Sequence, residues 1–305
     1  MDQHESAGQH VAHDLADDDL TRAVLASFGH GASERFQTVL QSLVRHLHAF
    51  VGEVRLTEEE WAKGIEFLTR TGHITDDKRQ EYILLSDVLG VSMLVIGLNN
   101  QRPAGATEST VFGPFFVEGS PKLANGAELA NGASGEPCYM HGRVLSLAGE
   151  PIPQARLEIW QADDQGFYDV QHKELTEAHC RGHLYTDTEG RYAFWSVRPE
   201  AYPIPDDGPV GELLAEARRS PMRPAHVHFM VTAPGYKMLI THVFAAGDRY
   251  LDSDAVFAVK NSLITEFTRH DPGAAPDGTA MSVPYYTMTY DFTLAPAEEP
   301  SGSHS

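Results

Sequence analysis

Hydrophobic side chains recur at helical spacing over the first hundred residues of the chain. Between residues 33 and 50 they form one stripe on an otherwise polar surface, the pattern of an amphipathic helix, at Phe36, Leu40, Leu43, Val44, Leu47 and Phe50. Thr57 and Glu60 have the spacing of a capping box, in which each side chain satisfies a backbone N–H of the first helical turn. We therefore expect a second helix from Thr57 to about Gly72.

A third helical segment is expected from about Asp76 onward, and it is apolar on most of its sides. Its hydrophobic residues are Tyr82, Leu84, Leu85, Val88, Leu89, Val91, Met93 and Val95. A helix that is hydrophobic all round is buried, so we expect this one to lie in the core or at a subunit contact. A weaker pattern over residues 15–28 predicts one more helix, so that residues 15–103 form a helical N-terminal region.

After residue 103 the hydrophobic pattern changes to a period of two. Over residues 286–294 apolar and polar side chains alternate strictly, which is typical of a half-buried strand. Glu189-Gly190 has the character of a hairpin turn. Further short strands are predicted over residues 155–161, 191–197, 225–233 and 238–244. Many short strands with Gly- and Pro-rich connections favour a β-sandwich, so the fold class is α+β, with a mostly antiparallel β-sandwich over residues 104–295.

The two ends of the chain are polar and rich in Ser, Gly, Pro or acidic residues. Such segments cannot bury enough apolar surface to offset the entropy that they would lose on folding. We therefore expect residues 1–14 and 296–305 to be disordered. His4, His10 and His13 are interpreted as a flexible, unselective histidine tract rather than a site.

The composition argues against two classes of partner. The 43 acidic residues outnumber the 23 basic ones and give a net charge of -20, whereas a protein that binds nucleic acid needs a basic surface. No apolar run reaches the roughly 18 residues of a membrane span, and the first residues lack a signal-peptide core. Cys138 and Cys180 cannot form a disulfide framework. We expect a cytoplasmic protein that binds neither nucleic acid nor a membrane.

A His-x-His pair lies in the strand predicted at residues 225–233. His226 and His228 are two residues apart, so they project from the same face of a strand and can reach one metal ion. Val227 and Phe229 mark the opposite face as the core face. Cross-strand polar residues on a sheet face would have the same spacing, so the motif alone leaves both interpretations open. Arg223 would place a fixed cation near any metal.

Two tyrosines stand in loops beside predicted strands. Tyr168 follows residues 164–167, which include a glycine, and Tyr202 precedes Pro203-Ile204-Pro205. Such loops can aim a phenol into a cleft, but a single tyrosine is more often a packed aromatic with a hydrogen-bonded hydroxyl. Taken alone, each tyrosine leaves both the ligand and the packing interpretation open.

The order Tyr168, Tyr202, Arg223, His226 and His228 resembles the intradiol ring-cleavage dioxygenases, which include catechol and hydroxyquinol 1,2-dioxygenases. The resemblance covers nearly the whole chain, including the helical region and the stretch at residues 110–116. It implies that one Fe(III) ion per subunit is bound by four protein ligands, with a solvent hydroxide as the fifth. These four are Tyr168, Tyr202, His226 and His228. Phenolates are hard anionic donors that favour ferric iron, and a bound trivalent cation removes the phenolic proton.

The resemblance also implies a reaction. The substrate is an aromatic diol that binds the iron as a dianion, and O2 is the co-substrate. Tyr202 is implied to leave the iron and carry away a substrate proton, and Arg223 to stabilise negative charge that develops on the ring. The positions implied to line the substrate pocket, besides Arg223, are Leu84, Asp87, Val111, Phe112, Gly113, Pro114, Phe115 and Pro205.

Two residues favour hydroxyquinol (benzene-1,2,4-triol) as the diol. Asp87 has apolar surroundings, and a buried carboxylate needs a partner, which the extra ring hydroxyl or an intramolecular contact could supply. Catechol-cleaving relatives tend to carry glutamine near His242, and residues 239–244 and 247–257 resemble the hydroxyquinol branch. We predict cleavage to 3-hydroxy-cis,cis-muconate, which tautomerises to maleylacetate, with catechol or chlorocatechol as alternative substrates. His242 is expected to hydrogen-bond the substrate or the arginine, or simply to pack, and not to bind the metal.

Members of this family are homodimers whose helical regions pack around an apolar tunnel that can hold a lipid. The broad apolar surface of residues 76–98 is consistent with such an assembly. Two other classes of protein remain open. One is a zinc hydrolase that uses His226, His228 and a carboxylate; the other is a non-catalytic β-sandwich binding module whose helical region serves only for assembly.

Overall fold

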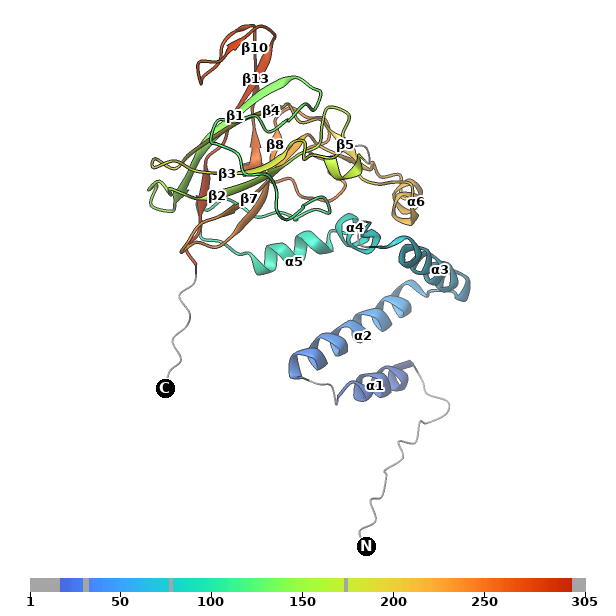
Figure 1. Ribbon diagram of the computed structural model, residues 1–305. Helices are drawn as coiled ribbons and strands as arrows, with labels where there is room; N and C mark the ends of the chain where they lie inside the picture. Colours follow the sequence, from blue (N-terminus) through green and yellow to red (C-terminus); the bar gives the residue numbers. More distant parts are fainter. Residues whose placement is uncertain (1–16, 30–32, 77–78, 173–174, 298–305) are drawn as a thin grey trace, which may run out of the picture. The chain divides into compact units, whose positions relative to one another are not determined.

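Two compact units make up the chain in the computed structural model, which describes residues 17–29, 33–76, 79–172 and 175–297 (Figure 1). The first unit extends from Met1 to Thr69 and the second from Arg70 to Ser305. The N-terminal segment expected to be disordered, residues 1–14, lies outside the described residues, as do residues 298–305. At the start of the expected C-terminal tail, Pro296 forms a bridge with Tyr236.

The first helices begin and end where local signals place them. They are α1 (Asp17–Ser27), α2 (Glu34–Val54) and α3 (Glu58–Ile74). The side chain of Ser33 caps α2 by accepting a hydrogen bond from Phe36 N at 3.2 Å. The capping box is confirmed at α3, where Glu60 N donates to Thr57 Oγ1 at 3.2 Å and Thr57 N donates to Glu60 Oε2 at 2.9 Å.

The third predicted helix is in fact two, α4 (Glu81–Val88) and α5 (Val91–Asn99), which bend by 79° at their junction. Gly90 at the bend has φ +72°, a left-handed conformation that glycine adopts without strain. The prediction of one continuous helix was wrong. α4 buries one face, including Leu84 and Asp87, whereas α5 exposes most of its side chains in the single chain, and for α5 the expected subunit contact stays a prediction. No single helix in the described ranges is long and apolar enough to span a membrane, although this bent pair passes that test together.

The second unit is built on two five-stranded sheets that pack face to face (Figure 1). One has the order β3-β2-β7-β8-β9. In the other, β10 pairs with β13, both β13 and β14 pair with one edge of β1, and β4 pairs with the opposite edge of β1. Most neighbouring strands are antiparallel, but β1–β13, β1–β14 and β8–β9 are parallel. The strands are β1 (Pro137–Ser146), β2 (Arg156–Trp160), β3 (Arg181–Tyr185), β4 (Arg191–Val197), β7 (His226–Thr232), β8 (Leu239–Ala245), β9 (Ile264–Thr265), β10 (Phe267–His270), β13 (Tyr285–Thr289) and β14 (Phe292–Leu294).

Short elements connect and extend the two sheets. Two pairs of short strands lie outside them: β5 (Tyr202–Pro203) with β6 (Met222–Arg223), and β11 (Gly273–Ala274) with β12 (Ala280–Met281). The remaining helix, α6 (Pro209–Glu216), contacts α4 because Val210 N donates to Glu81 Oε1 at 3.1 Å. Two 3-10 turns, Asp169–Gln171 and Asn261–Leu263, complete the described elements.

The long strand predicted over residues 286–294 is interrupted at Tyr290-Asp291. Tyr290 O approaches Gly142 of β1 so closely that a Cβ on that glycine would lie 1.8 Å from the oxygen. Asp291 turns its carboxylate to the backbone of β1 and accepts a hydrogen bond from Arg143 N at 2.8 Å. The pieces on either side, β13 and β14, therefore follow each other along one edge of β1.

The turn predicted at Glu189-Gly190 is present, but it does not form a hairpin. Asp187 Oδ1 accepts hydrogen bonds from Glu189 N and Arg191 N, each at 2.8 Å. The strands on its two sides belong to different sheets, since β3 pairs with β2 and β4 pairs with β1. The hairpin prediction was wrong because strand partners are chosen by packing across the sandwich, which a local turn does not reveal.

Candidate active site

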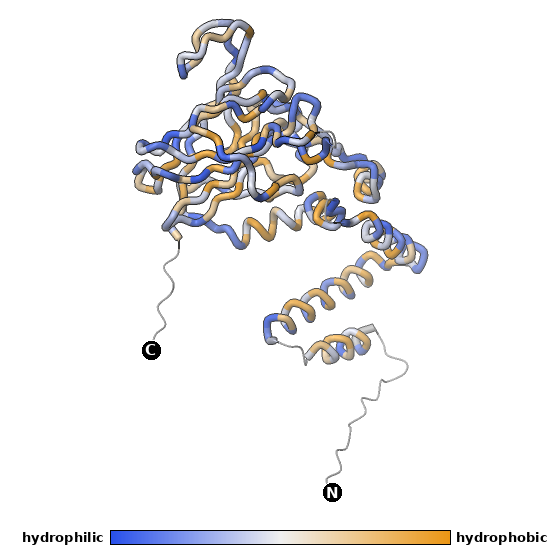
Figure 2. The backbone as a smooth tube through the Cα atoms, in the orientation of Figure 1, coloured by the Kyte–Doolittle hydropathy of each residue, from blue (hydrophilic) through white to orange (hydrophobic). Residues whose placement is uncertain are grey.

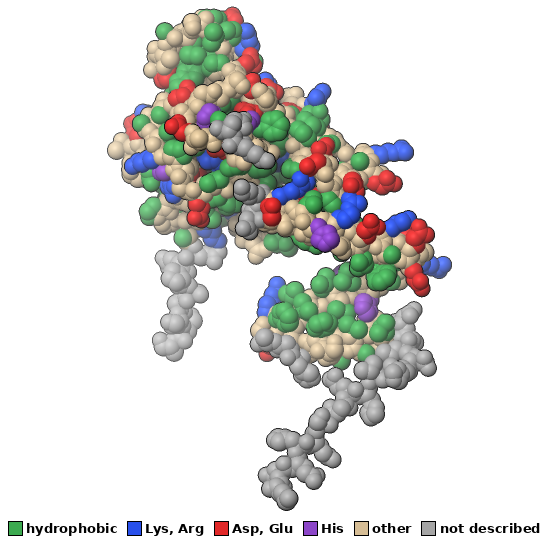
Figure 3. All heavy atoms as spheres, turned by 45° about the vertical axis from the view of Figure 1, so that its right-hand side comes forward, with side chains coloured by type: hydrophobic (Ala, Val, Ile, Leu, Met, Phe, Trp, Pro, Cys, Tyr) green, Lys and Arg blue, Asp and Glu red, His purple; other side chains and the backbone are tan. Residues whose placement is uncertain are grey.

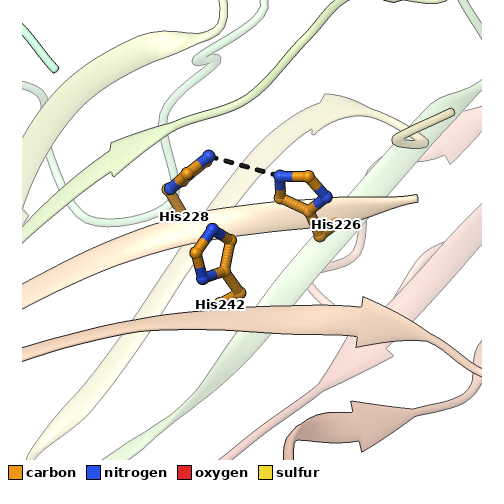
Figure 4. Close-up of side chains that lie close together, drawn as sticks. All are labelled: His226, His228 and His242. Atoms are coloured by element: carbon orange, nitrogen blue, oxygen red, sulfur yellow. Dashed lines mark hydrogen bonds between the residues drawn. The ribbon is translucent and has the colours of Figure 1, made fainter. Parts of the chain in front are cut away.

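Strand β7 directs two imidazoles to the face of its sheet that points away from the core. Val227 and Phe229 project into the sandwich and are fully buried. His226 and His228 project to the other side and are also buried. His242 of β8 stands directly opposite His228, and the three imidazoles lie together in Figure 4.

Four donor atoms from distant parts of the sequence meet at this face. Tyr168 Oη lies 2.9 Å from His228 Nε2, 3.1 Å from Tyr202 Oη and 3.5 Å from His226 Nε2. His226 Nε2 lies 3.2 Å from His228 Nε2 and 3.5 Å from Tyr202 Oη. Donor atoms that bind one metal at about 2.0–2.1 Å in tetrahedral geometry are separated by roughly 3.3 Å. The spacing therefore fits a single metal ion.

The protonation of the imidazoles also fits metal binding. His226 Nδ1 lies 2.7 Å from Pro224 O, and because a carbonyl only accepts, Nδ1 carries the proton and Nε2 keeps its lone pair. Burial lowers the pKa of His226 well below its usual value, and the Arg223 guanidinium lowers it further. Burial likewise lowers the pKa of His228, with the other imidazole adding to the effect. Two neutral imidazoles that face each other through their Nε2 atoms are suited to a shared cation.

The buried phenol of Tyr168 also needs a nearby cation if it is to ionise. Burial, and then the neighbouring phenol of Tyr202, raise the pKa of Tyr168 well above its usual value of about 10. An ionised Tyr168 in this site therefore requires a strong cation beside its oxygen. A tightly bound metal ion supplies such a charge.

Aromatic rings hold two of the four donor groups in place. The Phe115 ring stacks on Tyr168 with a centroid distance of 4.4 Å, and the indole of Trp160 stacks on His228 at 4.8 Å. Trp160 lies opposite His228 in the β2–β7 register, so strand pairing positions it there. Phe112 packs against Trp160 on the same side. These rings also exclude water from the donor atoms.

Two glycines allow the close packing around the donors. Gly113 has φ +78°, and a Cβ at this position would lie 3.0 Å from His228 Cε1. Gly166 has φ +84°, and a Cβ there would lie 2.7 Å from Tyr202 Cβ. At both positions a larger residue would be strained and would press on a donor side chain. Gly113 was expected to line the substrate pocket; the structure places it against His228.

An ion pair that we did not foresee from the sequence fixes the segment of Tyr168. Asp169 follows Tyr168 directly, and Arg181 at the start of β3 donates to its carboxylate from Nε at 2.9 Å and from Nη2 at 2.6 Å. Both side chains are buried. The sequence spacing of Asp169 and Arg181 does not indicate this ion pair, because the pair depends on the position of β3 beside β2.

Arg223 lies beside the four donors and opposite Tyr202 in the β5–β6 pair. It is buried, and its Nε donates to Asp254 Oδ1 at 3.1 Å. Burial alone would lower the pKa of Arg223, but the Asp254 carboxylate together with the phenols of Tyr202 and Tyr168 outweighs this effect, and the net shift is upward. The guanidinium therefore stays charged. Asp254 lies in the stretch that resembles the hydroxyquinol branch, but the sequence did not indicate this contact.

A cavity of about 560 Å³ adjoins the donor cluster. Phe115, which stacks on Tyr168, and Gly166, which contacts Tyr202, are part of its wall. Of the residues expected to line a pocket, five lie on this wall: Leu84, Asp87, Pro114, Phe115 and Pro205. Val111, Phe112 and Arg223 are not among its lining residues; Val111 and Arg223 are buried, and Phe112 packs against Trp160.

Asp87 is one of two buried carboxylates that line this cavity; the other is Glu81. Asp87 lies on the buried face of α4, one helical turn after Leu84. Burial raises the pKa of Asp87, and a hydrogen bond from Ser92 and the charge of Arg223 partly offset this effect. The carboxyl group therefore has an internal contact and also faces the cavity.

Two family models and a curated relative match the chain over most of its length. The model described as "Dioxygenase" matches residues 111–296, and the model described as "Catechol dioxygenase N terminus" matches residues 33–107. The hydroxyquinol 1,2-dioxygenase of Nocardioides simplex is 54% identical over 280 residues, which cover 92% of this chain and 95% of the relative. The chain belongs to the intradiol ring-cleavage dioxygenases.

Solved structures of other dioxygenases share the fold. A hydroxyquinol 1,2-dioxygenase from Pseudomonas putida DLL-E4 is 46% identical, with a TM-score of 0.87 over 92% of this chain and 99% of the other. The catechol 1,2-dioxygenase of Acinetobacter radioresistens is 26% identical, with a TM-score of 0.82 over 96% of this chain and 97% of the other. The predicted fold class of this dioxygenase, a helical N-terminal region followed by a mostly antiparallel β-sandwich, is confirmed. As an intradiol dioxygenase it is an enzyme that uses O2, which sets aside the zinc hydrolase and the binding module.

Gly113→Ala tests whether close packing on His228 is needed for metal binding. The new Cβ is expected to displace the imidazole, so the dioxygenase should lose most of its bound metal as well as about 1–2 kcal/mol of unfolding free energy from backbone strain. Metal content per subunit and denaturant unfolding measure the two effects. Gly119→Ala is the matched control, because Gly119 has φ +77° but no atom within 4 Å of its Cβ position. Equal metal loss in both variants would contradict the role of the contact.

Proposed function

We propose that the enzyme holds one Fe(III) ion per subunit and cleaves hydroxyquinol with O2 to 3-hydroxy-cis,cis-muconate, the tautomer of maleylacetate. The proposed ligands are Tyr168, Tyr202, His226 and His228. The proposal rests on one observation: two phenol oxygens and two imidazole nitrogens lie together in a buried site, at separations of 2.9–3.5 Å. Relatives named as hydroxyquinol 1,2-dioxygenases support the choice of substrate.

The chemistry of the donor set favours ferric iron. Phenolate oxygens are hard, anionic ligands that stabilise a trivalent ion, and neutral imidazoles suit iron as well. Two phenolates would offset two of the three charges of Fe(III), which matters in a site that is buried. Among the described residues, the group of possible metal ligands around His226 and His228 contains no carboxylate. The described residues at this site therefore fit a metal bound by phenolates and imidazoles better than a metal bound by carboxylates.

The side chains around the donors have separate tasks in the proposed reaction. The ferric ion would supply the electron withdrawal that makes the bound diol reactive toward O2. Tyr202 Oη accepts a proton from a diol hydroxyl, and the β5–β6 pairing holds Tyr202 opposite Arg223. Arg223 stabilises negative charge on the ring through an N–H that is free of other partners in the described structure. Phe115 and Trp160 exclude water.

Asp87 is the residue that we propose to recognise the third hydroxyl of hydroxyquinol. Its carboxyl group is buried and borders the cavity, so an unmet hydrogen-bond acceptor there would be costly. The third hydroxyl can donate to it, whereas catechol has no such group. The enzyme should therefore bind hydroxyquinol more tightly than catechol.

Replacement of either tyrosine tests the iron site. Tyr168→Phe and Tyr202→Phe each remove one phenolate, so we expect both variants to lose most of their iron and the visible charge-transfer band that colours the wild-type enzyme. Metal analysis and absorption spectra measure the loss. Tyr285→Phe is the control, because Tyr285 is also buried but its hydroxyl donates to Ala274 O, away from the site. If both site variants keep iron and colour, the ligand assignment is wrong.

Anaerobic titration with hydroxyquinol, catechol and a chlorocatechol tests the substrate. Each diol that binds should shift the colour of the iron site, and turnover under O2 then ranks them, with hydroxyquinol first. Asp87→Asn should weaken hydroxyquinol binding by about 10-fold, the effect of replacing a hydrogen bond to a charged acceptor by one to a neutral amide oxygen, and leave catechol binding nearly unchanged. Asp206→Asn, at an exposed position of the same cavity, is the control. Equal or better turnover of catechol by the wild-type enzyme would contradict the choice of hydroxyquinol.

We further propose that the enzyme is a homodimer formed through its helical region, residues 15–103, with a lipid held among the apolar helices. Helix α5 is apolar along most of its length (Figure 2). Its residues Leu94 and Leu98 are nevertheless about two-thirds exposed, at 65% and 64%. On α2 the apolar stripe is half exposed, and hydrophobic side chains gather on the helices near the N-terminus (Figure 3). Apolar patches of this kind mark interaction surfaces.

Leu94→Glu tests the proposed dimer. A charge on the apolar surface of α5 is expected to weaken self-association at least 10-fold, since burying an unpaired charge is costly. Sedimentation equilibrium of the full chain measures the dissociation constant. Leu147→Glu, at an exposed turn after β1, should leave it unchanged. A wild-type protein that is monomeric at micromolar concentration, or a fully dimeric Leu94→Glu variant, would contradict this interface.

The cysteines are compatible with a reducing compartment. Cys138 and Cys180 are free and buried. Burial raises the pKa of the Cys180 thiol to about 12, so it is a poor nucleophile at neutral pH. We propose that the enzyme acts in the cytoplasm, where free thiols persist.

A further inference from the structure

The guanidinium of Arg223 contacts other side chains on two of its sides, while one of its terminal nitrogens has no hydrogen-bond partner among the described residues. Its Nε donates to Asp254 Oδ1 at 3.1 Å. Its Nη1 lies 3.3 Å from His226 Nε2 and 3.5 Å from His242 Nε2. Nη2 is buried and has no hydrogen-bond partner among the described residues. A buried donor without a partner costs free energy, which points to a ligand that this end of the guanidinium receives.

The contact with Asp254 is rigid, because the backbone holds the carboxylate. Asp254 Oδ2 accepts a hydrogen bond from Ala258 N at 2.9 Å, and Oδ1 accepts one from Val256 N at 3.4 Å. The side chain is buried. Asp254 therefore fixes the Nε edge of Arg223 and offsets its charge.

The contact with His242 depends on which ring nitrogen carries the proton. An arginine only donates hydrogen bonds, so His242 Nε2 must keep its lone pair to accept from Nη1 of Arg223. The ring proton is then on Nδ1, where Thr110 Oγ1 is within hydrogen-bonding distance and accepts it. Thr110 is itself anchored to β8, because its N–H donates to Ile240 O at 3.0 Å.

The position of the His242 ring is determined independently of its tautomer. The β7–β8 register places His242 opposite His228, and the Phe244 ring stacks on it with an interplanar angle of 19°. Figure 4 shows the three imidazoles grouped on the two strands. Since the ring cannot move far, its proton is the remaining variable. Thr110 offers an acceptor to that proton on Nδ1 and so stabilises the tautomer whose Nε2 accepts from Arg223.

We propose that Asp254, His242 and Thr110 are positioning residues, which fix the guanidinium of Arg223 so that its free Nη2 donates to the bound diol. The inference rests on the proposed function, because the diol is the ligand that Nη2 receives. Asp254 holds one edge of the guanidinium, and His242 holds another. Thr110 acts at a distance by keeping the acceptor nitrogen of His242 toward the arginine.

Thr110→Val tests the clamp, because it keeps the shape of the side chain and removes the acceptor of the Nδ1 proton. The proton can then move to Nε2, where it would face Nη1 and displace the guanidinium. We expect the holoenzyme to keep its iron content and charge-transfer band. The anaerobic Kd for hydroxyquinol should rise and kcat should fall, each about 10-fold. Thr110→Ser retains the hydroxyl and should recover most of both.

Two further variants separate positioning from packing. Thr241→Val is the matched control: Thr241 is fully buried beside His242 on β8, and its hydroxyl donates to Glu108 O at 2.8 Å. It should bind and turn over hydroxyquinol like the wild type. In an Arg223→Met background, Thr110→Val should have no additional effect on Kd or kcat, because the residue through which Thr110 acts is gone.

Three outcomes would overturn the inference. One is wild-type affinity and turnover in Thr110→Val. A second is loss of iron in that variant, which would mean that Thr110 and His242 support the metal ligands instead of Arg223. The third is an additive loss in the double variant. A wild-type enzyme that binds no iron or no hydroxyquinol would overturn the proposed function, and this inference with it, before any variant is made.

Discussion

The alternation of side chains along β7 determines both the core of the sandwich and the position of the imidazoles. The strand lies between β2 and β8, with Val227 and Phe229 in the core and His226 and His228 on the opposite face. A shift of the register by one residue would send both imidazoles into the apolar core and both apolar side chains out of it. The free energy of core burial therefore also holds the imidazoles in place. The same register places Trp160 and His242 on either side of His228.

The site is buried, so each charge near the donor atoms needs compensation. Arg223 is paired with Asp254, and Arg181 is paired with Asp169. Removal of one partner of such a pair is expected to cost about 3–5 kcal/mol, because the other charge would stay buried without compensation. Each pair is neutral as a whole, so the net charge at the donor cluster would depend on the phenols and on the metal ion proposed there. The ion pairs thus fix the geometry of the site without adding net charge to it.

Features that depend on local periodicity could be predicted from the sequence, and features that depend on distant contacts could not. The capping box at Thr57 and the strand over residues 191–197 follow from local patterns, and both are present. The interruption at Tyr290 arises from Gly142 on another strand, and the turn at Glu189 joins strands whose partners lie in different sheets.

The residues of the candidate site also fall into those that local patterns indicate and those that only distant contacts reveal. The spacing of His226 and His228 indicated a shared face, but the two tyrosines gained meaning only through the family resemblance. Thr110 and Asp254 act through tertiary contacts with His242 and Arg223, and no spacing in the sequence reports such contacts. The bend at Gly90 was missed because a glycine inside an apolar run does not by itself distinguish a continuous helix from a broken one.

Asp87, Arg223 and Asp254 form an electrostatic series that would connect the proposed substrate choice with reactivity. Burial raises the pKa of Asp87 most strongly, Arg223 lowers it, and Asp254 raises it again. Asp254 forms an ion pair with Arg223 and so offsets part of the attraction between the guanidinium and Asp87. A hydrogen bond from a substrate hydroxyl would therefore stabilise the Asp87 carboxylate more. The same pairing acts on catalysis. A guanidinium paired with a carboxylate attracts negative charge less than a lone one would, so its proposed stabilisation of the ring would depend on the direct hydrogen bond that Nη2 can donate.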